Sequence, residues 1–149
     1  MMIRKATILL ALVITSTLVF AQNANDVIGK WKTIDDETGE AKSIVELYKV
    51  GDKLQGKVIQ ILNPTKVDNV CSLCEDGDAR KGKRIQGMII VKDMVWDDDE
   101  WEDGTILDPN KGSIYDCKLW LESDDKDKLY VRGYIGFLFR TQNWYRITE

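Results

Sequence analysis

After a long apolar start, hydrophobic and polar positions alternate in short runs that are separated by clusters of polar turn residues. The runs are rich in β-branched and aromatic residues, which favour strands over helices. We predict strands over Trp31–Ile34, Ser43–Val50, Leu54–Leu62, Gly87–Val95, Thr105–Leu107, Ser113–Leu121, Lys128–Ile135 and Phe139–Ile147. Because most connections are short, we expect an all-β domain with a single antiparallel β-barrel of about eight strands.

Two polar segments interrupt this pattern. Residues 63–83 form a long cysteine-bearing loop with room for a helical turn, and residues 23–27 add a short turn before the first strand. Acidic residues 97–103 predict a solvated hairpin rim with Trp96 and Trp101 beneath it. A calcium loop is disfavoured, because counting from Asp97 puts Glu102 where a calcium loop needs its glycine.

Side-chain alternation within two strands indicates which faces are buried. One face of Ser113–Leu121 is uniformly apolar or aromatic and should point inward; it carries Tyr115, Cys117, Leu119 and Leu121. Cys117 is therefore interpreted as a small buried hydrophobic residue rather than a reactive thiol. In Lys128–Ile135 one face carries Tyr130, Arg132 and Tyr134, and alternation alone does not decide whether that face points inward.

The apolar start has the organisation of a secretory signal peptide. Arg4 and Lys5 precede an uncharged apolar run of about 15 residues, which ends at the small residue Ala21. We predict a cleavable signal peptide over residues 1–21 and a mature domain over residues 22–149, exported to the periplasm or secreted. A retained anchor is the alternative, but the run is shorter than the about 20 residues of a comfortable membrane span. No transmembrane anchor is expected after cleavage.

Composition excludes several functions. Cleavage would remove two basic residues, leaving 19 Lys and Arg (21 minus 2) against 25 Asp and Glu, a net charge of −6. An acidic chain of this kind is a poor partner for nucleic acid, whose binding depends on phosphate neutralisation. The chain has no histidine, which removes the commonest general base and metal ligand. We predict no metal, no cofactor and no catalytic residues, while the oligomeric state stays open.

The Cys71-x-x-Cys74 pair has several interpretations. A disulfide is the default in an exported protein, because the compartment is oxidising. A redox-active pair is less favoured, since no helix start or βαβ context is evident that would lower a thiol pKa. A metal site would lack further ligands, and a disulfide from Cys117 to one of the two is the remaining alternative.

Several short motifs follow one another along the chain: Gly29-x-Trp31, Ser43-Ile44-Val45-Glu46, Gly56-Lys57-Val58, Cys71-x-x-Cys74, Gly87-Met88, Asp108-Pro109-x-x-Gly112-x-x-Tyr115, residues 129–136 and Gln142-x-Trp144-x-Arg146. In this order they resemble one bacterial secreted family, catalogued as domain of unknown function 2147. The resemblance covers about residues 28–147 and implies a lipocalin-like barrel with a ligand-sized interior. It also implies that Trp31 closes one end of the barrel and packs against Arg146. It implies no reaction.

The aromatic residues and one arginine are the candidates for ligand contact. The predicted ligand-binding residues are Arg132, Tyr115, Tyr130, Tyr134, Trp96, Trp101 and Trp144. Ordinary barrel core is the competing interpretation for each ring. Arg132 could grip an anionic group if its face points inward, or could pair with an acid on the outside.

Three functions follow from these observations. The leading hypothesis is non-catalytic binding or carriage of a small, partly apolar or anionic ligand inside the barrel. The alternatives are an envelope interaction module with a solidly packed barrel, and a thiol oxidoreductase that uses Cys71 and Cys74.

Overall fold

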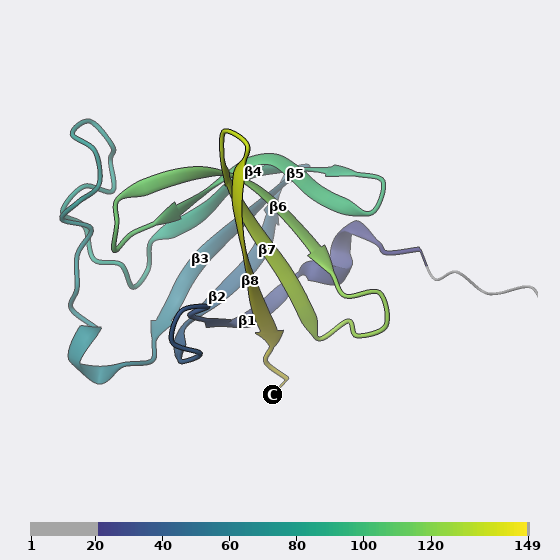
Figure 1. Ribbon diagram of the computed structural model, residues 1–149, viewed down its shortest axis with the longest axis horizontal. Coiled ribbons are helices and arrows are strands. Elements are labelled where there is room, and N and C mark those ends of the chain that lie inside the picture. The colour runs from purple at the N-terminus through teal and green to yellow at the C-terminus, as the bar shows by residue number, and fades with distance from the viewer. Residues whose placement is uncertain (1–20, 149) are drawn as a thin grey trace, which may run out of the picture.

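The structure is a computed structural model that describes residues 21–148. Apart from Ala21, the predicted signal peptide lies outside the described residues. Within them, eight strands each pair antiparallel with the next, and the last returns to the first, which closes the barrel (Figure 1). The strands are β1 (Gly29–Ile34), β2 (Ala41–Val50), β3 (Lys53–Ile61), β4 (Ile89–Asp97), β5 (Glu100–Asp108), β6 (Ser113–Leu121), β7 (Lys128–Ile135) and β8 (Leu138–Arg146). The predicted all-β antiparallel barrel is confirmed.

Strand β5 is longer than the sequence predicted. The expected strand Thr105–Leu107 is only the end of β5, which begins within the acidic run, at Glu100. Side chains alternate in direction along this part of β5, so acidic residues can belong to the strand. Trp101 is buried inside the barrel, while Glu100 and Glu102 both lie 2.6 Å from the Nζ of Lys118. The acidic run is therefore partly a hairpin turn and partly a strand, which is irregular between Trp101 and Gly104 where its register with β6 shifts.

The connections alternate between the two ends of the barrel, which creates a closed end and an open end. A short 3-10 helix, η1 (Ala24–Val27), covers the closed end, where the turns β2–β3, β4–β5 and β6–β7 also lie. The indole of Trp31 donates to the Val27 carbonyl at 2.8 Å, and that of Trp101 donates to the Ala24 carbonyl at 3.2 Å. These hydrogen bonds satisfy two buried indole donors and fix η1 over the closed end.

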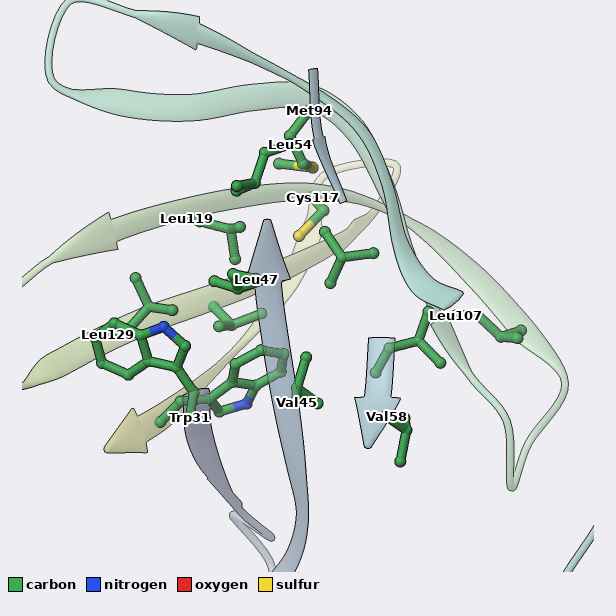
Figure 2. Close-up of a cluster of buried hydrophobic side chains, with 14 of the residues drawn as sticks. Trp31, Val45, Leu47, Leu54, Val58, Met94, Leu107, Cys117, Leu119 and Leu129 are labelled. Carbon is green, nitrogen blue, oxygen red and sulfur yellow. The ribbon is translucent and has the colours of Figure 1, made fainter. Parts of the chain in front are cut away.

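The buried hydrophobic side chains form one cluster inside the barrel, which includes Trp31 at the closed end and extends to Val58 and Leu107 in the open half (Figure 2). Its largest fully buried side chains include Trp31, Leu47, Leu54, Met94, Leu119 and Leu129. The inward face of β6 predicted from alternation is buried at Cys117, Leu119 and Leu121, as expected. Burial of these apolar side chains is the dominant favourable contribution to folding.

The long β3–β4 connection lies at the open end and contains the second 3-10 helix, η2 (Pro64–Lys66). A disulfide joins Cys71 to Cys74, and both cysteines are buried. The backbone of Leu73 packs directly on Gly112 in the β5–β6 turn, so the disulfide loop is docked against the barrel. Cys117 is a free, buried thiol, and burial raises its pKa.

Candidate ligand cavity

A cavity of about 670 Å³ occupies the open half of the barrel. Its lining comes from strands around the barrel, including the ends of β7 and β8 at Ile135 and Leu138, and from the connections β1–β2, β3–β4 and β5–β6 at the open end. Aliphatic side chains form much of the wall, and these are Val58, Ile61, Ile85, Ile90, Ile106, Leu107 and Val131. The size falls within the about 300–1,000 Å³ that is typical of small-molecule sites.

A small polar patch lies on the wall that β1, β2 and β8 form. The hydroxyls of Thr33 and Ser43 are buried and lie 2.8 Å apart, within hydrogen-bond distance. The indole of Trp144 donates to the Oε1 of Gln142 at 3.3 Å. Among the described residues, no buried side-chain nitrogen or oxygen lacks a hydrogen-bond partner. The inner wall therefore suits a neutral, mostly apolar group, because it offers no unpaired charge to a ligand.

Charged side chains lie at the rim of the cavity, near solvent. The lining residues of this kind are Asp35, Glu40, Lys42, Lys66, Asp108, Lys111 and Arg140. The hydrogen bond from Lys42, together with those from the Thr38 and Glu37 backbone amides, lowers the pKa of Asp35 to about 2.

Arg140 is already paired within the protein. Its Nη2 lies 2.6 Å from the Oδ1 of Asp36 and 3.2 Å from a carboxylate oxygen of Glu37. The hydrogen bond from Arg140 lowers the pKa of Asp36. Lys66 and Lys111 are exposed, and these two ammonium groups of the cavity lining have no ion-pair partner within residues 21–148.

Two of the predicted ligand-binding residues, Tyr115 and Trp144, line the cavity. Trp101 and Trp96 do not line it. Trp101 closes the far end beneath η1, and the Trp96 ring packs against it with the ring centroids 5.5 Å apart. Both tryptophans contribute to the closed end of the barrel rather than to the cavity.

Arg132, Tyr130 and Tyr134 also lie outside the cavity, because their face of β7 points outward. Leu129 and Val131 alternate with them and are buried inside the barrel. The Arg132 guanidinium lies between two aromatic rings, 4.8 Å from the centre of Trp120 and 4.4 Å from that of Phe139. Its Nε donates to the Thr141 hydroxyl at 2.7 Å. Arg132 therefore lies on the outward face of β7, which is one of the two directions that side-chain alternation left open.

Sequence reasoning missed the polar patch and the rim. Ser43 shares its face of β2 with the buried Val45 and Leu47, and Gln142 shares its face of β8 with the buried Trp144. Alternation could thus have placed both polar side chains inside. No local pattern in the sequence could show that the four open-end connections meet around one mouth.

The structure gives little support to cysteine chemistry. Cys71 and Cys74 are both at most 1% exposed, which shields the disulfide from a substrate thiol.

No group of three or more His, Cys, Asp or Glu that could hold a metal ion occurs in residues 21–148. Within the same range, no helix is long and apolar enough to cross a membrane.

A closed antiparallel barrel of eight strands with a cavity that opens at one end is a lipocalin-like fold. The chain belongs to the family described as an uncharacterized protein conserved in bacteria (DUF2147), whose profile matches residues 29–146. The structure is similar to that of protein HP1028 from Helicobacter pylori, which is described as a member of the lipocalin family. The TM-score is 0.69 at 16% sequence identity, over 82% of this chain and 83% of that one. No curated protein matches the chain significantly.

Proposed function

We propose that this protein is exported and binds a small, partly apolar molecule inside its barrel, without catalysing a reaction. The observation that carries the proposal is the cavity of about 670 Å³, with aliphatic walls and a few polar groups on one side. A pocket that combines apolar area with a small number of placed polar groups is typical of ligand sites.

The arrangement of polarity supports one orientation of the ligand. The inner wall carries only neutral polar groups, namely Thr33, Ser43, Tyr115, Gln142 and the Trp144 indole, whereas charged side chains lie at the rim. A molecule with an apolar body and a polar or anionic end would therefore place its apolar part deepest. The Lys66 and Lys111 ammonium groups would attract an anionic end.

Export is supported by two independent features. Residues 1–21 have the pattern of a cleavable signal peptide. The Cys71–Cys74 disulfide is of the kind that persists in the bacterial periplasm or outside the cell, where the environment is oxidising.

The alternatives are less well supported. An interaction module with a solidly packed barrel conflicts with the cavity. A thiol oxidoreductase would need an accessible sulfur, and both cysteines of the pair are buried.

Native mass spectrometry of the mature protein, purified from its own exported fraction, tests the proposal. We expect an adduct that disappears on denaturation, and its mass would identify the ligand class. The variant Val131→Phe should carry less adduct, because Val131 is buried in the cavity wall and a larger ring would project into the cavity. An adduct unaffected by this variant would place the ligand elsewhere, and a clean apo mass would argue against tight carriage.

A further inference from the structure

The β7–β8 hairpin ends in an unusually apolar tip, residues 135–139. The exposed fractions are 59% for Ile135, 92% for Phe137, 64% for Leu138 and 61% for Phe139. Single exposed apolar side chains are common, but four within five consecutive residues form a continuous patch that marks an interaction site. In Figure 1 the hairpin is the yellow-green loop that projects at the top of the barrel.

We propose that this apolar tip inserts into the surface of a lipid bilayer and holds the mouth of the cavity against the membrane. The inference rests on the proposed function, because it makes the bilayer the source or destination of the apolar molecule that the barrel binds.

The backbone of the hairpin meets the main requirement for entering lipid. Strands β7 and β8 pair in register out to Ile135 and Leu138, and only Gly136 and Phe137 form the turn. Gly136 has a φ of 57°, which lets the chain reverse over two residues. Because few backbone groups at the tip lack a cross-strand partner, insertion would leave few polar groups unsatisfied in the apolar phase.

The tip suits a bilayer better than a protein partner. A stable protein–protein contact buries about 800 Å² on each side, over about 20–30 residues. This tip is narrow, because a turn of only two residues joins the strands. Its four apolar side chains can each enter the boundary between headgroups and acyl chains.

The tip is continuous with the cavity mouth. Ile135 and Leu138 are exposed to solvent and also line the cavity. Lys66 and Lys111, at the same rim, would face lipid phosphates when the tip is inserted. An apolar molecule could then pass between bilayer and barrel without crossing bulk water, which is the step that the hydrophobic effect makes unfavourable.

Flotation with phosphatidylcholine vesicles, with and without phosphatidylglycerol, tests the proposal on the mature chain. We expect binding to both vesicle types with little salt dependence, because apolar insertion rather than charge drives it. The double variant Phe137→Ser/Leu138→Ser should bind at least about tenfold more weakly. The matched control is Val50→Ser, since Val50 is also 59% exposed beside a hairpin turn but lies at the closed end.

A second measurement reports insertion directly and does not depend on variant stability. Phe137→Trp should show a blue-shifted emission with vesicles and quenching by brominated phospholipid, whereas Val50→Trp should show neither. The proposal is overturned if the wild-type protein does not float with the vesicles, or if the double Ser variant floats as well as the wild type. Self-association through the tip that vesicles do not reverse, measured by sedimentation, would also overturn it in favour of a protein contact.

Uptake of cis-parinaric acid without vesicles separates this proposal from the proposed function. The single variant Phe137→Ser should still take up the fatty acid, because Phe137 is 92% exposed and is not among the residues that line the cavity. If the wild-type protein binds vesicles but takes up no fatty acid, membrane docking is supported while carriage of that class is not. If it takes up the fatty acid but does not bind vesicles, docking is overturned and the proposed function stands.

Discussion

The guanidinium carbon of Arg146 lies 4.3 Å from the centre of the Trp31 ring at the closed end of the barrel. The same guanidinium donates hydrogen bonds to the backbone carbonyls of Asp26 at 2.6 Å, Ile28 at 3.1 Å and Lys126 at 3.0 Å. One side chain from the end of β8 therefore connects η1, the start of β1 and the β6–β7 turn. The pairing of β1 with β8 closes the barrel at this same place.

We predict that Arg146→Ala lowers the free energy of unfolding by about 2–4 kcal/mol, because it removes a cation–π contact and leaves backbone carbonyls without a donor. Urea unfolding measures the change. Arg146→Lys is the control that keeps the charge but loses the planar fork, so its stability should lie between those of the wild type and Arg146→Ala. Wild-type stability of Arg146→Ala would show that Trp31 holds the closed end without it.

Of two neighbouring residues on β7, only the inward-facing one should affect ligand binding. Val131→Phe places a ring in the cavity and should weaken uptake of cis-parinaric acid at least about tenfold, because overlap with the ligand removes apolar contact. Arg132→Ala should leave uptake unchanged and cost about 1 kcal/mol of stability, because Arg132 stacks on the outer surface between Trp120 and Phe139. Fluorescence titration and thermal unfolding measure the two effects. Weaker uptake by Arg132→Ala would show that the outer face takes part in binding.

Stability should fall in acid below about pH 4. Hydrogen bonds from Lys42 and Arg80 lower the pKa values of Asp35 and Asp78, respectively, from 3.8 to about 2. Since the folded pKa values lie below the unfolded ones, the ionised carboxylates stabilise the fold above the unfolded value. This contribution is lost as the pH falls towards about 2. The urea midpoint measured across this range should therefore decline.

The variant Asp78→Asn tests the origin of that decline. Asp78 accepts from the Arg80 side chain at 2.7 Å, and Arg80 in turn donates to the Ile89 carbonyl at 3.2 Å on β4. Asp78→Asn should be less stable than the wild type near neutral pH and lose less stability in acid. Asp52→Asn, at an exposed turn position, is the control and should follow the wild-type profile. Parallel profiles for Asp78→Asn and the wild type would assign the decline to other groups.

The three cysteines should behave differently towards a thiol reagent. We expect no reaction of the native protein with dithionitrobenzoate and one thiol per chain in denaturant, because Cys117 is buried and Cys71 is bonded to Cys74. Replacing Cys71 and Cys74 with serine should cost about 2 kcal/mol, near the low end for disulfides, since the ring that they close is small. Three thiols per chain in denaturant would contradict the disulfide.

A side chain at Gly112 should destabilise the fold. A Cβ at this position would lie 1.9 Å from the Leu73 carbonyl oxygen, and the φ of 70° is unfavourable for other residues. Gly51 has a similar φ of 62° with open space around it, so Gly51→Ala isolates the backbone cost of about 1–2 kcal/mol. Gly112→Ala should cost about 1–3 kcal/mol more in urea unfolding, because the disulfide loop must move away. Equal losses for the two variants would show that the loop adjusts freely.

Much of the fold could be predicted because its signals are local. Alternation in Ser113–Leu121 identified the inward face of β6, and the burial of Cys117 followed from it. The start of β5 was missed because acidic residues dominate that segment, and only the ion pairs of Lys118 with Glu100 and Glu102 explain how a strand accommodates them. The outward direction of Arg132 could not be predicted, because both faces of β7 carry large side chains.

The sequence by itself determined most of the strands, their antiparallel order and the cysteine-bearing loop, since each depends on side chains that are close along the chain. Only the tertiary structure decided that Thr33, Ser43 and Gln142 share one wall, and that the apolar tip of the β7–β8 hairpin lies at the cavity mouth. Barrel closure brings β1 beside β8, and alternate connections gather at each end. These distant neighbours therefore depend on the register of the whole sheet rather than on any local pattern.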